Sequence, residues 1–184
     1  MTREEAISFL EIENDYQTTD IFDSVDEKLF QIKNETLQKI AVPTLLKKRV
    51  HDCQKINDAL KALGLEETNT EQTFGTSIIS TEPITFLEEY ERAISAAKLA
   101  LFNARSAPQL ATVLENIILL QENFNGHFIA VMEKFGPFES LDIPSRETTD
   151  TGVILKALKS ENPEEARALI QREAGRLLKI ASLG

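Results

Sequence analysis

Residues 43–64 read PTLLKKRVHDCQKINDALKALG, and this stretch decides the fold class. Its apolar residues recur at steps of three and four, so they share one face of an α-helix. They are Leu46, Val50, Cys53, Ile56, Leu60 and Leu63. Pro43 separates this helix from the one before it, because proline disfavours helical geometry in Val42. With Gly64 where a C-terminal cap is expected, the stretch predicts a complete amphipathic helix.

The same periodicity continues toward the N-terminus. A capping box of Thr2 and Glu5 predicts the start of a short first helix. A second helix is expected from Thr19 or Asp20 up to the residues before Pro43. Its apolar stripe is Phe22, Val25, Leu29, Ile32, Leu37 and Ile40. Because only about three residues separate it from the next helix, the two are expected to form an antiparallel hairpin.

A second hairpin is predicted downstream, between Thr85 and Val131. The stripe of its first helix is Leu87, Tyr90, Ile94, Ala97, Leu101 and Ala104. The stripe of its second helix is Leu110, Val113, Ile117, Leu120, Phe124, His127 and Val131. A short sixth helix follows, and then a seventh that starts at Asn162-Pro163. With no convincing strand pattern, the sequence predicts an all-α protein built from helical hairpins.

The helices are expected to form two parts joined by a linker. Residues 65–82 hold Thr, Ser, Asn and Gly with four glutamates and no lysine or arginine, a composition typical of a linker. The predicted organisation is a three-helix unit over residues 1–64, this linker, and a C-terminal helical bundle over residues 83–184.

Composition and charge narrow the classes of function. The chain carries a net charge of −10, and neither half has the basic excess that binding to a phosphate backbone needs. Nucleic acid is therefore not an expected partner. The chain also has no run of about 18 apolar residues that could span a bilayer, so a membrane is not an expected partner either. Cys53 is the single cysteine and cannot form an internal disulfide, which fits a reducing compartment. Because the acidic N-terminus is unlike a signal peptide, the sequence predicts a cytoplasmic protein.

Residues 6–63 resemble a J-domain. The resemblance is one of layout: a short helix with Phe9-Leu10-Glu11-Ile12, a polar turn, and a long hairpin ending in Ile56-Asn57-Asp58-Ala59-Leu60-Lys61-Ala62-Leu63. J-domains often end in a similar Ile-Asn-x-Ala-x-x-x-Leu-like stretch. The resemblance implies a three-helix unit with a co-chaperone-like role in binding other proteins.

The motif on which J-domain activity depends is missing. J-domains that stimulate DnaK-type chaperones carry His-Pro-Asp in the hairpin loop, where this chain has Ala41-Val42-Pro43-Thr44. Their second helix is strongly basic, whereas residues 23–40 here hold three lysines against four acidic residues. The resemblance therefore implies a degenerate J-like unit that binds protein without stimulating a chaperone.

His127 has the widest range of candidate chemistry. On the expected stripe between Phe124 and Val131, it could act as a phosphoacceptor, a metal ligand or a general base. The alternative, which we favour, is a part-buried histidine with one hydrogen bond. Tyr90, His127 and an arginine of the last helix are the candidate polar groups of an apolar ligand pocket. Cys53 lies on a helix stripe and is expected to be an inert core thiol.

The sequence holds no familiar motif for a metal or a cofactor. Di-iron bundles need Glu-x-x-His pairs, and neither His51 nor His127 has a glutamate three residues before it. With two histidines in the chain, a three-histidine site is impossible. Phosphate loops, nucleophile elbows and calcium loops are absent as well. We therefore expect no cofactor and no metal, and we name no catalytic residue.

The leading hypothesis is a non-catalytic protein-interaction or adaptor protein that binds a protein partner or forms a homo-oligomer. It predicts an apolar patch left exposed on the isolated chain. One alternative is a small-ligand-binding or enzymatic bundle with a pocket near Tyr90 and His127. Another is a helix-turn-helix regulator built from residues 153–180, which the acidic composition disfavours.

Overall fold

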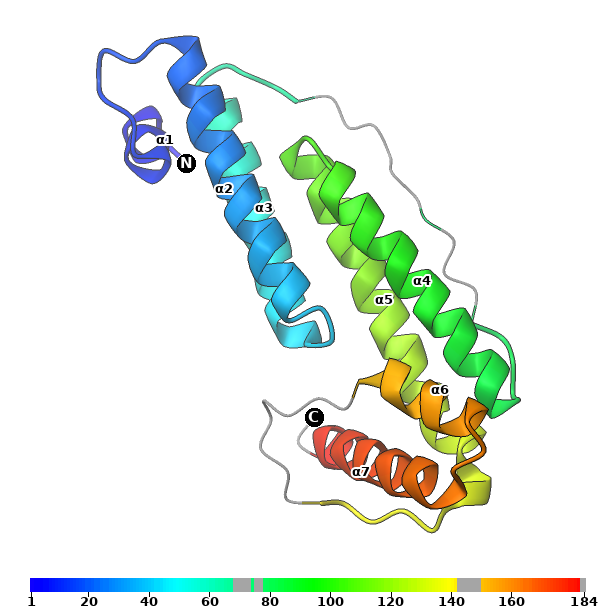
Figure 1. The fold of residues 1–184 in the computed structure, drawn as a ribbon. Coiled ribbons are helices and arrows are strands. Elements are labelled where there is room, and N and C mark those ends of the chain that lie inside the picture. Colours follow the sequence, from blue (N-terminus) through cyan, green and yellow to red (C-terminus); the bar gives the residue numbers. More distant parts are fainter. Residues whose placement is uncertain (68–73, 75–77, 142–149, 183–184) are drawn as a thin grey trace. The chain divides into compact units, whose positions relative to one another are not determined.

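The computed structural model describes residues 1–67, 74, 78–141 and 150–182. Within these ranges the chain forms helices joined by loops and contains no strand (Figure 1). The α-helices are α1 (Arg3–Leu10), α2 (Thr18–Gln38), α3 (Pro43–Ala62), α4 (Pro83–Asn103), α5 (Ala107–Val131), α6 (Thr151–Lys159) and α7 (Pro163–Ser182). A 3-10 helix, η1, covers Glu133–Phe135. The predicted all-α fold class is confirmed.

Spatial contacts divide the chain into two compact units. Unit 1 comprises residues 1–75 and 96–119. Unit 2 comprises residues 76–95 and 120–184. Each unit therefore uses one part of α4 and one part of α5, and neither unit is a continuous segment of the chain.

The predicted linker over residues 65–82 lies in part outside the described residues. Its first residues are attached to unit 1, because Glu67 Oε2 accepts a hydrogen bond from Ala107 N at 3.0 Å. Independent folding of residues 1–64 and of residues 83–184 stays a prediction.

Local capping chemistry sets several helix ends. The predicted capping box of α1 is present: Thr2 Oγ1 accepts from Glu5 N at 3.2 Å, and Glu5 Oε2 accepts from Thr2 N at 2.7 Å. After α3, Gly64 has a φ of 78°, a left-handed conformation that glycine adopts without a Cβ clash. Before α7, Asn162 Oδ1 accepts from Glu165 N at 3.3 Å. These predicted start and stop signals therefore act as expected.

α4 begins two residues earlier than the expected Thr85, at Pro83. The cap is supplied by Glu82, whose Oε2 accepts from Thr85 N at 2.7 Å. This hydrogen bond lowers the pKa of Glu82, because it favours the charged carboxylate. An acidic residue before a proline thus starts the helix where a threonine was expected to do so.

The buried row of α2 differs from the predicted stripe. Its members are Ile21, Val25, Leu29, Ile32 and Thr36. Phe22 and Leu37 of the predicted stripe are instead 43% and 38% exposed. Thr36 can take the core position beside Leu37 because its hydroxyl donates to Ile32 O at 2.7 Å, which satisfies the buried group.

The core of unit 1 joins α1, α2 and α3 to the adjoining ends of α4 and α5. α3 contributes its predicted stripe from Leu46 to Leu60. α4, α5 and the turn between them contribute Ala97, Leu101, Ala104, Ala107, Leu110, Val113, Leu114, Ile117 and Ile118. Lys33 of α2 reaches the end of α4, where its Nζ donates to Phe102 O at 3.2 Å and also to Ala104 O. Segments far apart in the sequence therefore complete one core.

Aromatic side chains dominate the core of unit 2. Phe86 stacks on Phe124 with the ring centroids 5.2 Å apart, and Phe128 packs against Phe124 at 5.4 Å. The ring of Tyr90 lies 4.0 Å from that of Phe124. α6 packs on α7, and the buried apolar side chains of these two helices are Ile154, Ala157, Ala166, Ile170, Ala174 and Leu177.

Candidate functional site

Tyr90 lies in the interior of unit 2, on the predicted stripe of α4. It is 5% exposed, and its hydroxyl accepts a hydrogen bond from Gln121 Nε2 at 2.9 Å. Burial raises the pKa of Tyr90 to about 12. The phenol, which is protonated at neutral pH, packs against the ring of Phe124 and hydrogen-bonds Gln121.

A buried ion pair lies in unit 2. Glu173 and Arg176 of α7 are 1% and 8% exposed. Arg176 Nε donates to Glu173 Oε2 at 3.1 Å, and Arg176 Nη2 donates to Glu173 Oε1. The charge of Glu173 acts to raise the pKa of Tyr90 and that of Arg176 acts to lower it. Tyr90 hydrogen-bonds Gln121 and Arg176 hydrogen-bonds Glu173, and the predicted pocket that Tyr90 shares with an arginine of the last helix stays a prediction.

His127 lies outside the buried row of α5. It is exposed, whereas the next residue, Phe128, is fully buried. Each residue turns an α-helix by about 100°. The buried row runs from Phe124 through Phe128 to Met132, at steps of four residues. The prediction that His127 lies on the apolar stripe is therefore wrong.

His127 borders a hollow of about 350 Å³ in unit 2. The other lining residues are Ile78, Ile79, Ser80, Thr81, Phe86, Ala130 and Val131. Glu89 holds one wall in place, because its Oε2 accepts from Ile79 N at 2.9 Å and from Ser80 N at 3.0 Å. Tyr90 does not line this hollow. A ligand held jointly by Tyr90 and His127 stays a prediction.

Cys53 is expected to be unreactive in the folded protein. It is buried in α3, and desolvation raises the pKa of its thiol to about 12, with Asp52 acting in the same direction and Arg49 against it. Because the thiolate is the reactive form, the reagent DTNB at pH 8 should label native protein far more slowly than protein unfolded in guanidinium. Rapid stoichiometric labelling of the native protein would contradict this placement.

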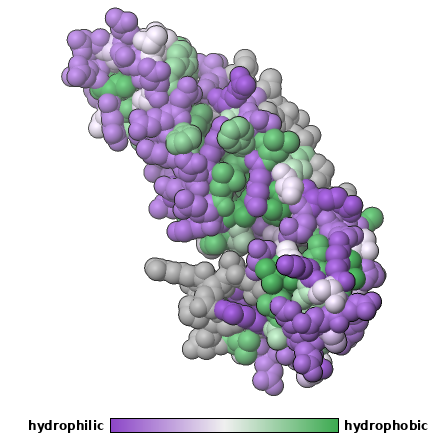
Figure 2. Space-filling model, in the orientation of Figure 1, coloured by the Kyte–Doolittle hydropathy of each residue, from purple (hydrophilic) through white to green (hydrophobic). Residues whose placement is uncertain are grey.

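Unit 1 carries large apolar side chains on its surface. We call this set the exposed face: Phe22, Phe30 and Leu37 of α2, with Leu99 and Phe102 of α4. Phe30 is 64% exposed and Phe102 is 73% exposed. Figure 2 shows hydrophobic residues open to the surface among hydrophilic ones. The sequence holds one signal for this face: Phe30 is a large apolar residue that falls outside the predicted stripe of its helix.

Lys33 joins the two helices that carry the exposed face. It follows Phe30 by one turn of α2, and its ammonium donates to the backbone of Phe102 on α4. Desolvation lowers the pKa of Lys33, while the charge of Asp26 acts to raise it. The hydrogen bonds of Lys33 therefore hold this part of α2 against the end of α4.

Among the described residues, neither a metal site nor a membrane span is found. Over residues 1–67, 74, 78–141 and 150–182, no three His, Cys, Asp or Glu side chains are grouped so that they could hold a metal ion. In the part of the chain that the structure describes, no helix combines the length and the apolar character needed to cross a bilayer.

Comparison of the chain with protein-family models, with curated proteins and with solved structures found no match. A functional assignment therefore depends on the geometry of the two units themselves.

Proposed function

We propose that this chain is a non-catalytic protein-interaction or adaptor protein, with the exposed face of unit 1 as its docking surface. The observation that carries the proposal is the exposure of Phe30 and Phe102, at 64% and 73%, on helices that Lys33 holds together. Grouped apolar side chains on a surface are typical of interaction sites, and aromatic residues often supply most of the binding energy. Burying each phenylalanine would contribute about 1.5–3 kcal/mol.

The interior of unit 2 supports the non-catalytic part of the proposal. Tyr90, Gln121, Glu173 and Arg176 are buried, and they hydrogen-bond in pairs. Catalytic acids and bases need access to a substrate and a pKa near the working pH, whereas the pKa of Tyr90 is raised to about 12. This cluster has the properties expected of a structural element.

A degenerate J-like origin of residues 6–63 is part of the same proposal. α1 packs against α2 and α3, an arrangement compatible with that layout. The loop before Pro43 lacks the flanking histidine and aspartate of active J-domains. We therefore propose co-chaperone-like protein binding without stimulation of a DnaK-type chaperone.

We also propose a cytoplasmic location and protein rather than nucleic acid as the partner. The single cysteine is buried and unpaired, which fits a reducing compartment. A net charge of −10 disfavours contact with a phosphate backbone. If α6 and α7 formed a helix-turn-helix, Arg176 could not contact DNA, because its side chain is buried in an ion pair with Glu173.

Affinity capture from native cell extract, read by mass spectrometry, tests the proposed docking surface. The wild-type chain is compared with a Phe30→Ser/Phe102→Ser variant. The matched control is Ile79→Ser/Leu119→Ser, which replaces two apolar residues that are 83% and 61% exposed but lie outside the exposed face. We expect the face variant to recover at least about tenfold less of a specific partner, because each lost aromatic contact costs about 1–2 kcal/mol of binding free energy.

The control variant should retain that partner at the wild-type level. Equal recovery of the same proteins by all three chains would show that the exposed face is not the docking surface. Circular dichroism of each variant is needed alongside, so that a change in recovery reports the surface and not the fold.

The hollow beside His127 supports a second candidate, a small apolar ligand in unit 2. Its volume, about 350 Å³, lies within the range of ligand pockets. A ligand-observed NMR screen with His127→Ala as the comparison tests this candidate. If the compounds found in the screen bind the wild type and His127→Ala with equal affinity, His127 does not contribute to the ligand site.

A further inference from the structure

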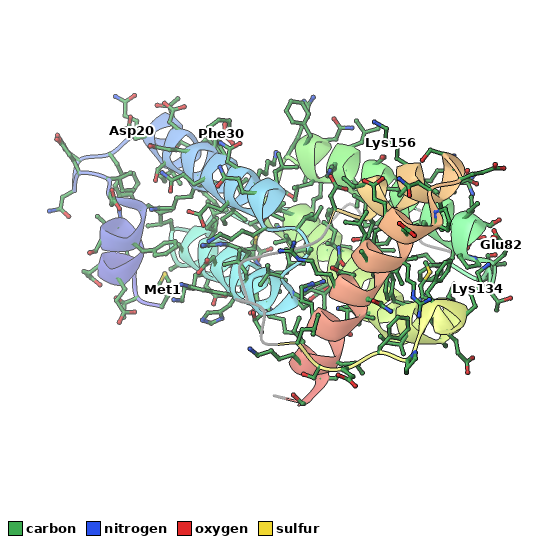
Figure 3. The ribbon with its side chains drawn as sticks, turned by 60° about the horizontal axis from the view of Figure 1, so that its bottom comes forward. Met1, Asp20, Phe30, Glu82, Lys134 and Lys156 are labelled. Carbon is green, nitrogen blue, oxygen red and sulfur yellow. The ribbon has the colours of Figure 1, made fainter. Side chains whose placement is uncertain are left out.

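α2 carries two parallel rows of residues, displaced by one position. The buried row is Ile21, Val25, Leu29, Ile32 and Thr36. The outer row is Phe22, Asp26, Phe30, Lys33 and Leu37, at the same steps of four, four, three and four. Steps of this kind keep the members of a row on one face of a helix, so the outer row is a continuous stripe. Phe30, at its centre, lies on the side of α2 away from α3 (Figure 3).

The outer row is complementary to itself when it is reversed. Turning it end for end about a point between residues 29 and 30 brings Phe22 onto Leu37 and Asp26 onto Lys33. Phe30 then lies next to Phe30 of the second copy. Apolar residues meet apolar residues and each carboxylate meets an ammonium, which is the pattern that a two-fold symmetric interface requires.

We propose that the partner of the exposed face is a second copy of this chain, with α2 packed antiparallel on α2 in this register. The inference rests on the proposed function, since it names the occupant of the same docking surface. A partner carrying charges of one sign would match only half of the outer row, because that row holds one acid and one base. A second copy matches both.

Lys33 retains the capacity to form the pair across the interface. An ammonium has three donors, and two of those of Lys33 go to carbonyl oxygens at the end of α4. The third can be donated to Asp26 of the second copy. Because the interface is two-fold, this pair would form twice in each dimer.

The area of the exposed face reaches that of a stable dimer when the second copy covers Leu99 and Phe102 of α4 as well as the outer row of α2. At about 200 Å² for each phenylalanine side chain, the three at 43%, 64% and 73% exposure offer roughly 350 Å². Leu37 and Leu99 bring the apolar area of one copy to about 500 Å². Two copies would bury about 1,000 Å² of apolar surface, and a polar rim would raise the total into the standard interface range of about 1,200–2,000 Å².

Sedimentation equilibrium of the full chain with charge-reversal variants tests the register. The wild type is expected to be a dimer at micromolar concentration. In an Asp26→Lys dimer two lysines face each other, and in a Lys33→Glu dimer two acids face each other. Each variant alone should therefore have a dimer dissociation constant at least about tenfold higher than that of the wild type. An equimolar mixture of the two variants should recover the dimer as a mixed species, because every contact is then between opposite charges.

Cysteine cross-linking provides a test that does not disturb the core. Phe30→Cys places a thiol near the two-fold axis, and Cys53 contributes little background because it is buried. Mild oxidation should join Phe30→Cys chains into covalent dimers. A Leu119→Cys control, exposed to a similar degree but outside the exposed face, should remain largely monomeric.

A monomeric wild type with no cross-linking at position 30 would overturn the inference. So would a mixture of Asp26→Lys and Lys33→Glu that dimerises no better than the separate chains, when circular dichroism shows that both variants retain the wild-type fold. The capture experiment then decides the proposed function separately. Capture of a different protein that depends on Phe30 and Phe102 would support the exposed face as a docking surface. If the chain is monomeric and no such protein is captured, the proposed docking surface is rejected as well.

Discussion

An Arg176→Met variant is expected to lose about 3–5 kcal/mol of folding free energy. Methionine keeps much of the volume of the side chain, but Glu173 would lose its guanidinium partner while remaining 1% exposed. Removing a hydrogen-bonded guanidinium from a buried carboxylate weakens the electrostatic stabilisation of that side chain. The change is therefore expected to act through electrostatics more than through packing.

Guanidinium unfolding monitored by circular dichroism measures this loss. The matched control is Glu173→Leu/Arg176→Met, which removes both charges and should recover most of the wild-type stability. The double variant separates loss of the pair from loss of packing. If the single and double variants were equally destabilised, the ion pair could not be the cause.

A Phe128→Ala variant is expected to lose about 3–5 kcal/mol. Phe128 is fully buried, and its ring centroid lies 5.4 Å from that of Phe124 and 6.5 Å from that of Phe86. Removing the ring leaves a cavity among aromatic neighbours that cannot easily close. His127→Ala, at the adjacent exposed position, should change the stability by no more than about 0.5 kcal/mol.

Thermal and chemical unfolding of Phe128→Ala and His127→Ala give a direct comparison of two neighbouring positions. A large loss with His127→Ala and a small one with Phe128→Ala would restore the stripe predicted from the sequence and reject the one in the structure. The same two variants also show whether the hollow beside His127 contributes to stability.

α3 could be predicted from the sequence because several local signals agree there. Pro43 precedes it, Gly64 follows it, and the apolar steps leave little choice of buried face. Where local chemistry and periodicity both point to one structure, a single sequence is sufficient. The capping box of α1 and the start of α7 at Asn162-Pro163 are of the same kind.

α2 and α5 show where periodicity is insufficient. Both rows of α2 hold large apolar residues, so the choice between Ile21 and Phe22 depends on what packs against the helix. In α5, alternating steps of three and four pointed to His127, whereas the buried row takes steps of four to Phe128 and Met132. An α-helix drifts by about 20° in each heptad, so a heptad pattern loses its register over a long helix.

Contacts between distant segments could not be read from the sequence. The burial of Glu173 and Arg176 is one example, because spacing alone does not show which charges are enclosed. The union of residues 96–119 with α1, α2 and α3 depends on tertiary packing. The exposed face depends on the same packing, since Lys33 of α2 reaches the backbone of Phe102 only through it.

The two segments of unit 1 leave the ribosome at different times, because residues 76–95 of unit 2 are made between them. The first segment of unit 1 ends at residue 75, and its second is finished only at residue 119. At about 5–20 residues per second, synthesis of that interval takes roughly 2–9 s. During this time the newly made α1, α2 and α3 lack the apolar surface of α4 and α5 that will cover them. Nascent chains on one polysome would therefore be most prone to associate with one another, or to be bound by cellular chaperones, before residue 119 has been added.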